Sequence, residues 1–319
     1  MATADTDNPV VGAYTGAIDL SRPHFVGVGG SAMAGLAKLF AARGSIVTGT
    51  DATDSPRIAA LREAGCSIKI GHDPRAIEQA TCVVFTTATG RTPEVAAAQV
   101  QGVPVVHRAQ ALQHLATDSR LVAVAGTHGK STTAGMLVAA LRQLQQDPSY
   151  VIGAELGLPG SGAHSGKGQL LVAEADESDR SFQLLRPAAA VITTIEYDHP
   201  ENFGDIDSYL AAYVTFAARI QHHGVLVANA DEDASRDMAR RVRRLRPDLK
   251  ILTFGRSDLA DVRIVYVDRQ GWNTAMSLVV IDGGRVVEQG RHDELLKRTG
   301  VYRRLHEAQF GDAARLLRA

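Results

Sequence analysis

Short apolar runs alternate with longer amphipathic stretches along most of the chain. Runs rich in valine, isoleucine and phenylalanine predict strands, and the glycines that follow several amphipathic stretches predict the ends of helices. Strands that alternate with helices predict parallel sheets covered by helices. In the first part of the chain we expect strands at 25–28, 46–50, 67–70, 83–87 and 104–107, and helices at 31–43, 56–64, 75–79 and 94–101.

The alternation resumes after a polar junction at 116–120. The helix after the first of the later strands is expected to bury one face, made of Met136, Leu137, Ala140, Leu141 and Leu144. Further strands are expected at 121–125, 170–173, 191–195, 225–228 and 251–254, and further helices at 207–220 and 234–245.

These patterns predict an α/β protein of two domains. After a flexible leader at 1–22 we expect a Rossmann-like domain at 23–117. A P-loop-type α/β domain, with a parallel-rich sheet and helices on both faces, is expected at 118–278. Residues 279–319 change in character and are expected to form a short hairpin and a helix.

Composition excludes few classes of protein but favours a soluble one. The chain has 319 residues, 45% of them hydrophobic, and a formal net charge of -1, which gives no sign of a nucleic-acid or membrane-surface partner. We find no apolar run of signal-peptide or membrane-helix length, so a cytoplasmic location is expected. Cys66 and Cys82 lack the spacing of a metal site and are expected to be core residues.

The segment Gly126-Thr-His-Gly-Lys-Ser-Thr132 lies between a predicted strand and a predicted helix, where backbone N–H groups bind phosphate. Lys130 can reach a terminal phosphate, and Ser131 can bind Mg²⁺. The common P-loop pattern places its first glycine further upstream, where Val124 stands, so this loop is shorter. The predicted nucleotide-binding residues are Gly126, Thr127, His128, Gly129, Lys130, Ser131 and Thr132.

An earlier glycine loop, Gly27–Gly35, also follows a strand and opens a helix, and Asp51 ends the next strand. This is the arrangement of a dinucleotide fingerprint, which makes NAD one candidate ligand. The alternative is a tight turn that packs a helix closely on the sheet. Because a second phosphate loop follows, we favour a nucleotide-linked substrate that meets ATP.

Carboxylates follow two of the later strands. Glu174-Ala-Asp-Glu-Ser-Asp179 comes after the strand at 170–173, and Glu196-Tyr-Asp-His199 comes after the strand at 191–195. Acidic groups at the carboxyl edge of such a sheet, beside a phosphate loop, predict bound Mg²⁺. The alternatives are a solvated acidic turn for the first segment and a structural histidine for His199.

Together these motifs resemble the Mur ligase family, over about residues 24–276 and including His24-Phe-Val-Gly-Val-Gly-Gly30. The resemblance implies an ATP-dependent ligase of peptidoglycan precursor synthesis that joins L-alanine to UDP-N-acetylmuramate through an acyl phosphate. It implies ATP and Mg²⁺ as cofactors, with Lys130, Glu174 and His199 as catalytic residues and Ser131, Glu174 and His199 as metal ligands. The implied UDP-sugar residues are Gly29, Gly30, Ser31, Met33, Asp51, His72, Thr87 and Arg108.

The later part of the chain departs from the family pattern. We find no His-Asn-x-x-Asn segment for adenine and expect the third domain of the family to be absent. Residues 281–310 resemble instead the end of an ABC-transporter nucleotide-binding domain, without its catalytic motifs. Weak ligand binding and little turnover are therefore expected, with self-association or a partner that supplies the third domain both open. The other candidates are a UDP-sugar-binding module and, less favoured, an NAD-dependent oxidoreductase.

Overall fold

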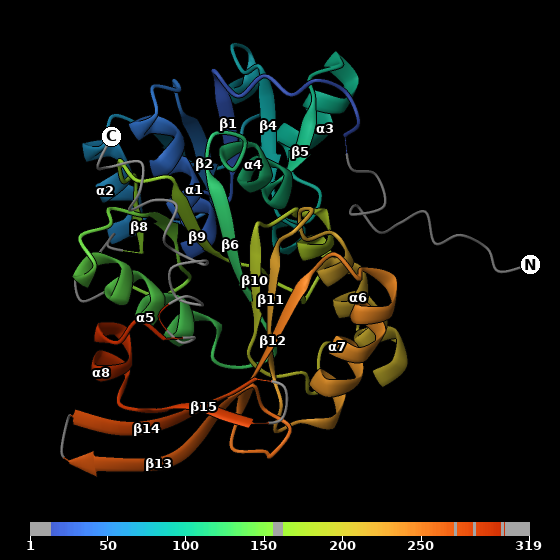
Figure 1. Cartoon of the computed structure of the whole chain (residues 1–319). Helices are drawn as coiled ribbons and strands as arrows, with labels where there is room; N and C mark the ends of the chain where they lie inside the picture. Colours follow the sequence, from blue (N-terminus) through green and yellow to red (C-terminus); the bar gives the residue numbers. More distant parts are fainter. Residues whose placement is uncertain (1–13, 156–161, 271–272, 283–284, 301–302, 304–319) are drawn as a thin grey trace, which may run out of the picture. The chain divides into compact units, whose positions relative to one another are not determined.

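The computed structural model describes residues 14–155, 162–270, 273–282, 285–300 and 303 (Figure 1). The chain divides into two compact units. The first consists of Met1–Val124 and Lys130–Arg186, and the second of Ala125–Gly129 and Pro187–Ala319. No helix within the described ranges is both long and apolar enough to cross a membrane.

The first unit begins with a five-stranded parallel sheet in the order β3-β2-β1-β4-β5, which confirms the predicted Rossmann-like arrangement. Helices α1 and α2 contact each other, while α3 packs on β4. The order reverses between β1 and β4, and ligands of such sheets bind beside that point. The elements are β1 (Pro23–Val26), α1 (Ser31–Ala42), β2 (Thr48–Asp51), α2 (Pro56–Glu63), β3 (Ser67–Ile70), β4 (Cys82–Phe85), α3 (Pro93–Gln101) and β5 (Val105–His107).

Local sequence explains where these helices begin and end. The side chain of Ser55 accepts a hydrogen bond from the N–H of Ile58 at the start of α2, and Thr92 does the same for Val95 at the start of α3. Proline follows each cap, where its missing N–H costs nothing. Helix α3 ends at Gly102, whose φ of 71° suits glycine.

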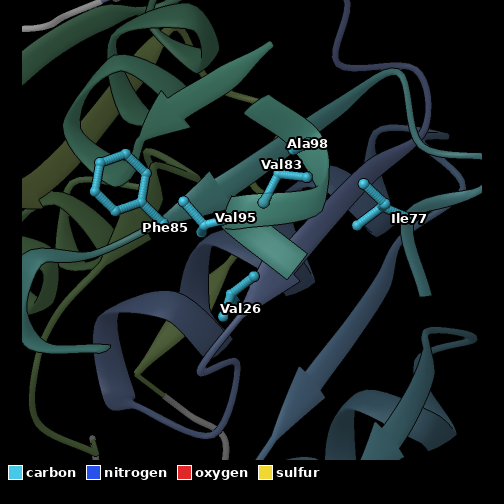
Figure 2. Packing of buried hydrophobic residues seen from close by; sticks show 6 residues of the cluster. All are labelled: Val26, Ile77, Val83, Phe85, Val95 and Ala98. Carbon is cyan, nitrogen blue, oxygen red and sulfur yellow. The ribbon is translucent and has the colours of Figure 1, made fainter. Parts of the chain in front are cut away.

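One hydrophobic cluster fixes α3 on this sheet (Figure 2). Val26 comes from β1 and Val83 from β4, while Val95 and Ala98 face them from α3. Alternate strand residues and helix residues three apart supply these contacts, as the sequence pattern predicts. The cluster consists of Val26, Ile77, Val83, Phe85, Val95 and Ala98.

The rest of the first unit holds strands in the order β6-β9-β7-β8, of which β6, β9 and β7 are parallel. The predicted buried face of α5 is wrong except for Leu141, because Met136 is 65% exposed and Leu144 is 38% exposed. The buried stripe is Ala134, Val138 and Leu141, which lets a small side chain approach β9 closely. The elements are α4 (Arg108–Leu115), β6 (Arg120–Ala125), α5 (Lys130–Gln143), β7 (Ser149–Val151), β8 (Ala163–His164) and β9 (Leu170–Glu174).

The second unit has strands in the order β10-β11-β12-β13-β14-β15, parallel up to β13 and antiparallel afterwards. Helices α6 and α7 contact each other, and α7 contacts β11 (Figure 1). The pairing of β14 with β15, followed by α8, confirms the predicted hairpin and helix; residues 283–284 of its turn lie outside the described residues. The elements are β10 (Ala189–Ile192), α6 (Ile206–Ala218), β11 (Val225–Asn229), α7 (Asp233–Leu245), β12 (Lys250–Gly255), β13 (Val262–Gln270), β14 (Asn273–Asp282), β15 (Arg285–Gly290) and α8 (His292–Lys297).

Candidate active site

The short glycine loop after β6 requires glycine for two separate reasons. Gly126 has φ of 134° and Gly129 has φ of 79°, a range that side chains with a Cβ rarely adopt. A Cβ on Gly126 would also lie 2.1 Å from Oγ1 of Thr193. The shortened spacing of this loop therefore serves a close contact with the residues that follow β10.

Those residues hold the loop by hydrogen bonds within the second unit. The N–H of Thr127 donates to the carbonyl of Thr194 at 3.0 Å, and the N–H of His128 donates to Oγ1 of Thr194 at 3.0 Å. Oγ1 of Thr193 donates to the carbonyl of His128 at 2.5 Å. The N–H groups of Thr127 and His128 are thus engaged by the fold, so the predicted phosphate cradle depends on the loop residues that follow them.

Helix α5 begins at Lys130, and its ammonium group meets a buried carboxylate of the acidic segment. Nζ of Lys130 lies 2.8 Å from Oε1 of Glu177, a side chain that is 1% exposed. Burial raises the pKa of Glu177, and the nearby Lys130 charge opposes that shift without cancelling it. The lysine assigned to phosphate therefore carries the counter-charge of Glu177 in this structure.

Asp176 of the same segment pairs with Arg108, the first residue of α4. Nη2 of Arg108 lies 2.7 Å from Oδ2 of Asp176, and the N–H of Ser178 donates to Oδ1 at 3.0 Å. Arg108 follows His107 of β5, so it stands at the carboxyl edge of the first sheet. The structure thus places this predicted UDP-sugar residue against the acidic segment.

Asp179 is surrounded by donors. Oγ1 of Thr87 donates to its Oδ2 at 2.6 Å, and the N–H of Ser181 donates to its Oδ1 at 2.9 Å. Nε2 of His107 lies 3.3 Å from Oδ2; because Nδ1 of His107 accepts from the N–H of Ala109, Nε2 carries the proton. Burial raises the pKa of Asp179, but these donors outweigh it and hold the pKa well below its ordinary value.

A cavity of about 210 Å³ in the first unit is lined by several of these groups. Two cations and two carboxylates line it, together with Ser31 and Ala32 of the first glycine loop. Oε1 of Glu174 also accepts a hydrogen bond from the N–H of Gly153 at 2.6 Å. The predicted residues that meet here are Ser31, Arg108, Lys130 and Glu174, joined by Asp176.

The remaining UDP-sugar predictions have contacts of their own. Oδ2 of Asp51 accepts from the N–H of Gly29 at 2.8 Å, so Asp51 holds the first glycine loop. Nδ1 of His72 lies 3.0 Å from Oε1 of Glu94, which is 0% exposed. The Met33 side chain is 2% exposed and belongs to the core, which leaves its backbone as the part that can reach a ligand.

His199 lies in the second unit, after β10, and has φ of 58°. Its Nδ1 lies 3.2 Å from Oε1 of Glu201, and its N–H donates to Oδ1 of Asp198 at 2.8 Å. Strand β10 ends at Ile192, earlier than predicted. Within the part of the chain that the structure describes, no group of three or more His, Cys, Asp or Glu side chains is placed to hold a metal, so Ser131, Glu174 and His199 stay predicted ligands.

Two family profiles match the chain. The profile described as "Mur ligase family, catalytic domain" matches residues 22–120, and the profile described as "Mur ligase middle domain" matches residues 124–288.

The chain belongs to the Mur ligase family.

Two curated relatives of this Mur ligase share one name. The UDP-N-acetylmuramate–L-alanine ligase of Streptomyces coelicolor is 43% identical over 279 residues, which cover 86% of this chain and 60% of the relative. That of Acidothermus cellulolyticus is 47% identical over 247 residues, which cover 77% of this chain and 51% of the relative. The chain thus spans 51% to 60% of the length of these two relatives.

Solved Mur ligase structures share the fold. The UDP-N-acetylmuramate:L-alanyl-gamma-D-glutamyl-meso-diaminopimelate ligase of Neisseria meningitides aligns with a TM-score of 0.71 at 23% identity, over 94% of each chain. The UDP-N-acetylmuramate-alanine ligase of Thermotoga maritima aligns with a TM-score of 0.70 at 23% identity, over 86% of this chain and 62% of that one. At these identities the likeness concerns the fold alone.

Several residues of the site had no assigned role from the sequence. Glu177 stands inside the acidic motif, but its burial against Lys130 depends on the folded chain. The sequence did contain an indication of the role of Thr193 and Thr194. Hydroxyl side chains at the end of a strand beside a phosphate loop can form hydrogen bonds with the backbone of that loop. Glu94 looks like an ordinary helix residue in the sequence, and no local pattern distinguishes it.

Proposed function

We propose that this Mur ligase chain binds UDP-N-acetylmuramate and ATP, as part of a ligase that joins L-alanine to the muramate carboxylate in peptidoglycan precursor synthesis. The observation that carries the proposal is the cavity lined by Lys130, Arg108 and Glu174. A lysine for the ATP phosphates, an arginine for an anionic group of the sugar nucleotide and a carboxylate for a cation are what such a reaction requires. The name shared by the curated relatives supports the substrates.

In the proposed reaction the γ-phosphate of ATP passes to the muramate carboxylate, the amine of L-alanine attacks the acyl phosphate, and inorganic phosphate leaves. Lys130 neutralises the transferred phosphoryl group, and Arg108 orients the sugar nucleotide. Ser131 and Glu174 have the oxygen donors that suit Mg²⁺, with His199 as the predicted ligand of a second ion. Bound Mg²⁺ would supply further neutralisation of phosphate charge.

The proposal assigns the UDP-sugar to residues 23–117 and ATP to residues 118–278. In the ligand-free chain Lys130 and Arg108 are paired with Glu177 and Asp176. Anionic ligands must therefore share or replace these carboxylates. Because Asp176 is the more exposed of the two carboxylates, the Arg108 pair is expected to exchange more readily than the Lys130 pair.

Calorimetric titration tests the assignment of the two ligands. We expect the parent chain to bind UDP-N-acetylmuramate and, separately, the non-hydrolysable ATP analogue AMPPNP with Mg²⁺. Arg108→Met is expected to weaken UDP-sugar binding about tenfold or more, because it removes a charged hydrogen bond, and to leave AMPPNP binding within about twofold. Absence of UDP-sugar binding by the parent at millimolar concentration contradicts the proposal.

NADH serves as the control ligand for the first glycine loop. The proposal predicts no saturable NADH binding, because Asp51 already holds the N–H of Gly29 and the UDP-sugar is the proposed occupant of this edge of the sheet. Tight NADH binding without UDP-sugar binding would instead favour the oxidoreductase hypothesis. Self-association and the need for a partner chain stay predictions.

A further inference from the structure

Thr127 of the phosphate loop is held by a tyrosine of helix α6. Oγ1 of Thr127 lies 3.1 Å from the hydroxyl oxygen of Tyr209, and that hydroxyl lies 3.4 Å from the hydroxyl of Tyr213, one helical turn further on. Both tyrosine side chains are 0% exposed. A buried hydroxyl that reaches a functional loop has few solvent alternatives, so its hydrogen bond fixes the loop more firmly than a surface contact does.

The donors and acceptors around Thr127 determine which group donates in each of these hydrogen bonds. Oγ1 of Thr127 donates its proton to the carbonyl of Glu196 at 2.9 Å and accepts from the N–H of Glu196 at 3.0 Å. A hydroxyl has one proton and two lone pairs, so Tyr209 is the donor to the remaining lone pair. Tyr209 can then accept from Tyr213. The Thr127 hydroxyl is thereby saturated by protein groups and serves the shape of the loop.

The Tyr209 ring has little freedom to move. Its centroid lies 4.7 Å from that of Phe203 and 5.3 Å from that of Tyr213, with edge-to-face geometry in both pairs. The ring of Tyr197, which belongs to the segment Glu196–His199, meets it edge-on at 6.1 Å. Tyr209 therefore contacts the phosphate loop through its hydroxyl and the Glu196–His199 segment through its ring.

We propose that Tyr209 is a positioning residue for the phosphate-binding loop: its buried hydroxyl donates to Thr127 and fixes the loop and the Glu196–His199 segment in one arrangement. The loop conformation required for phosphate is then present before nucleotide arrives. This inference rests on the proposed function only where it concerns nucleotide affinity, since the ordering of the loop is a property of the ligand-free chain.

The test compares Tyr209→Phe with Tyr213→Phe. Both variants remove one buried hydroxyl from the same helix and keep the ring, but only the first removes the donor to Thr127. In ligand-free protein we expect Tyr209→Phe to raise amide hydrogen exchange across residues 126–133 about tenfold, with Tyr213→Phe close to the parent. We also expect Tyr209→Phe to raise the Kd for Mg²⁺–AMPPNP about tenfold and to leave the Kd for UDP-N-acetylmuramate within about twofold.

A double-mutant cycle separates positioning from general loss of stability. Thr127→Val is expected to reproduce the nucleotide effect of Tyr209→Phe, Thr127→Ser to retain most of the affinity, and the double variant to lose no more than Thr127→Val alone. Unchanged loop exchange in Tyr209→Phe, or an equal change in Tyr213→Phe, overturns the inference. If the parent binds no nucleotide, the proposed function fails, while the exchange measurement still decides the role of Tyr209.

Discussion

The ammonium group of Lys130 lies 2.8 Å from the carboxylate of Glu177, a side chain that is 1% exposed. The residue assigned to the ATP phosphates therefore also compensates a buried negative charge. Removal of one partner from such a pair costs far more stability than replacement of both, because the remaining charge is left buried and uncompensated. On the proposed assignment of Lys130 to phosphate, nucleotide binding and the stability of the first unit depend on the same lysine.

Lys130→Met is expected to lower the free energy of unfolding of the ligand-free chain by about 3 kcal/mol, because Glu177 loses its counter-charge. The double change Lys130→Met with Glu177→Gln is expected to recover most of this loss, since the remaining glutamine is neutral. Urea unfolding followed by circular dichroism measures both. Lys250→Met, at an exposed strand residue, is the control, and an equal loss in that variant would rule out the explanation.

Gly126→Ala is expected to destabilise the chain by about 3 kcal/mol or to prevent folding, because its Cβ meets Oγ1 of Thr193 and its φ is unfavourable for alanine. Gly204→Ala is the matched control, since a Cβ at Gly204 meets no atom within 4 Å. Thermal unfolding of the two variants compares them. Equal melting temperatures for both variants and the parent would contradict the observed close contact.

The free energy of unfolding is expected to fall with pH over the range between the unfolded and folded pKa values of His24. Burial lowers the pKa of His24 from 6.5 to about 4, with Lys69 and His72 adding to the shift and Glu94 opposing it. His24 takes up its proton at a higher pH in the unfolded chain than in the folded chain. The free energy of unfolding therefore decreases as the pH falls from 6.5 to about 4, by about 3 kcal/mol in total. Parallel urea titrations across that range should show a flatter profile for His24→Gln. An unchanged profile in that variant would assign the pH dependence to other groups.

Most strands and helices could be predicted because apolar runs, and glycines at the ends of helices, are local features of the sequence. Helix α4 was not predicted, because Arg108 follows His107 of β5 directly and no turn residues separate the strand from the helix. Strand β13 was missed as well, since Val262–Gln270 mixes charged and apolar residues and pairs antiparallel with β14. The buried face of α5 was wrong because its orientation depends on contact with β9 and not on its own apolar count.

Several residues of the candidate site could be predicted from the sequence, whereas the contacts between them could not. Motif spacing was enough to select Lys130 and Glu174, and the resemblance to the Mur ligase family added Arg108. The folded chain brings these three residues to one cavity. The contacts that hold them are long-range, and no spacing reveals them. Lys130 on Glu177 and Arg108 on Asp176 are examples, since each joins segments far apart in the sequence.

The central claim is that Lys130 binds nucleotide phosphate, and the folded double variant tests it most directly. Calorimetry with Mg²⁺–AMPPNP should give saturable binding to the parent and at least about tenfold weaker binding to the variant that combines Lys130→Met with Glu177→Gln, with UDP-N-acetylmuramate affinity unchanged in both. Equal nucleotide affinity in parent and double variant, or no nucleotide binding by the parent, would contradict the account.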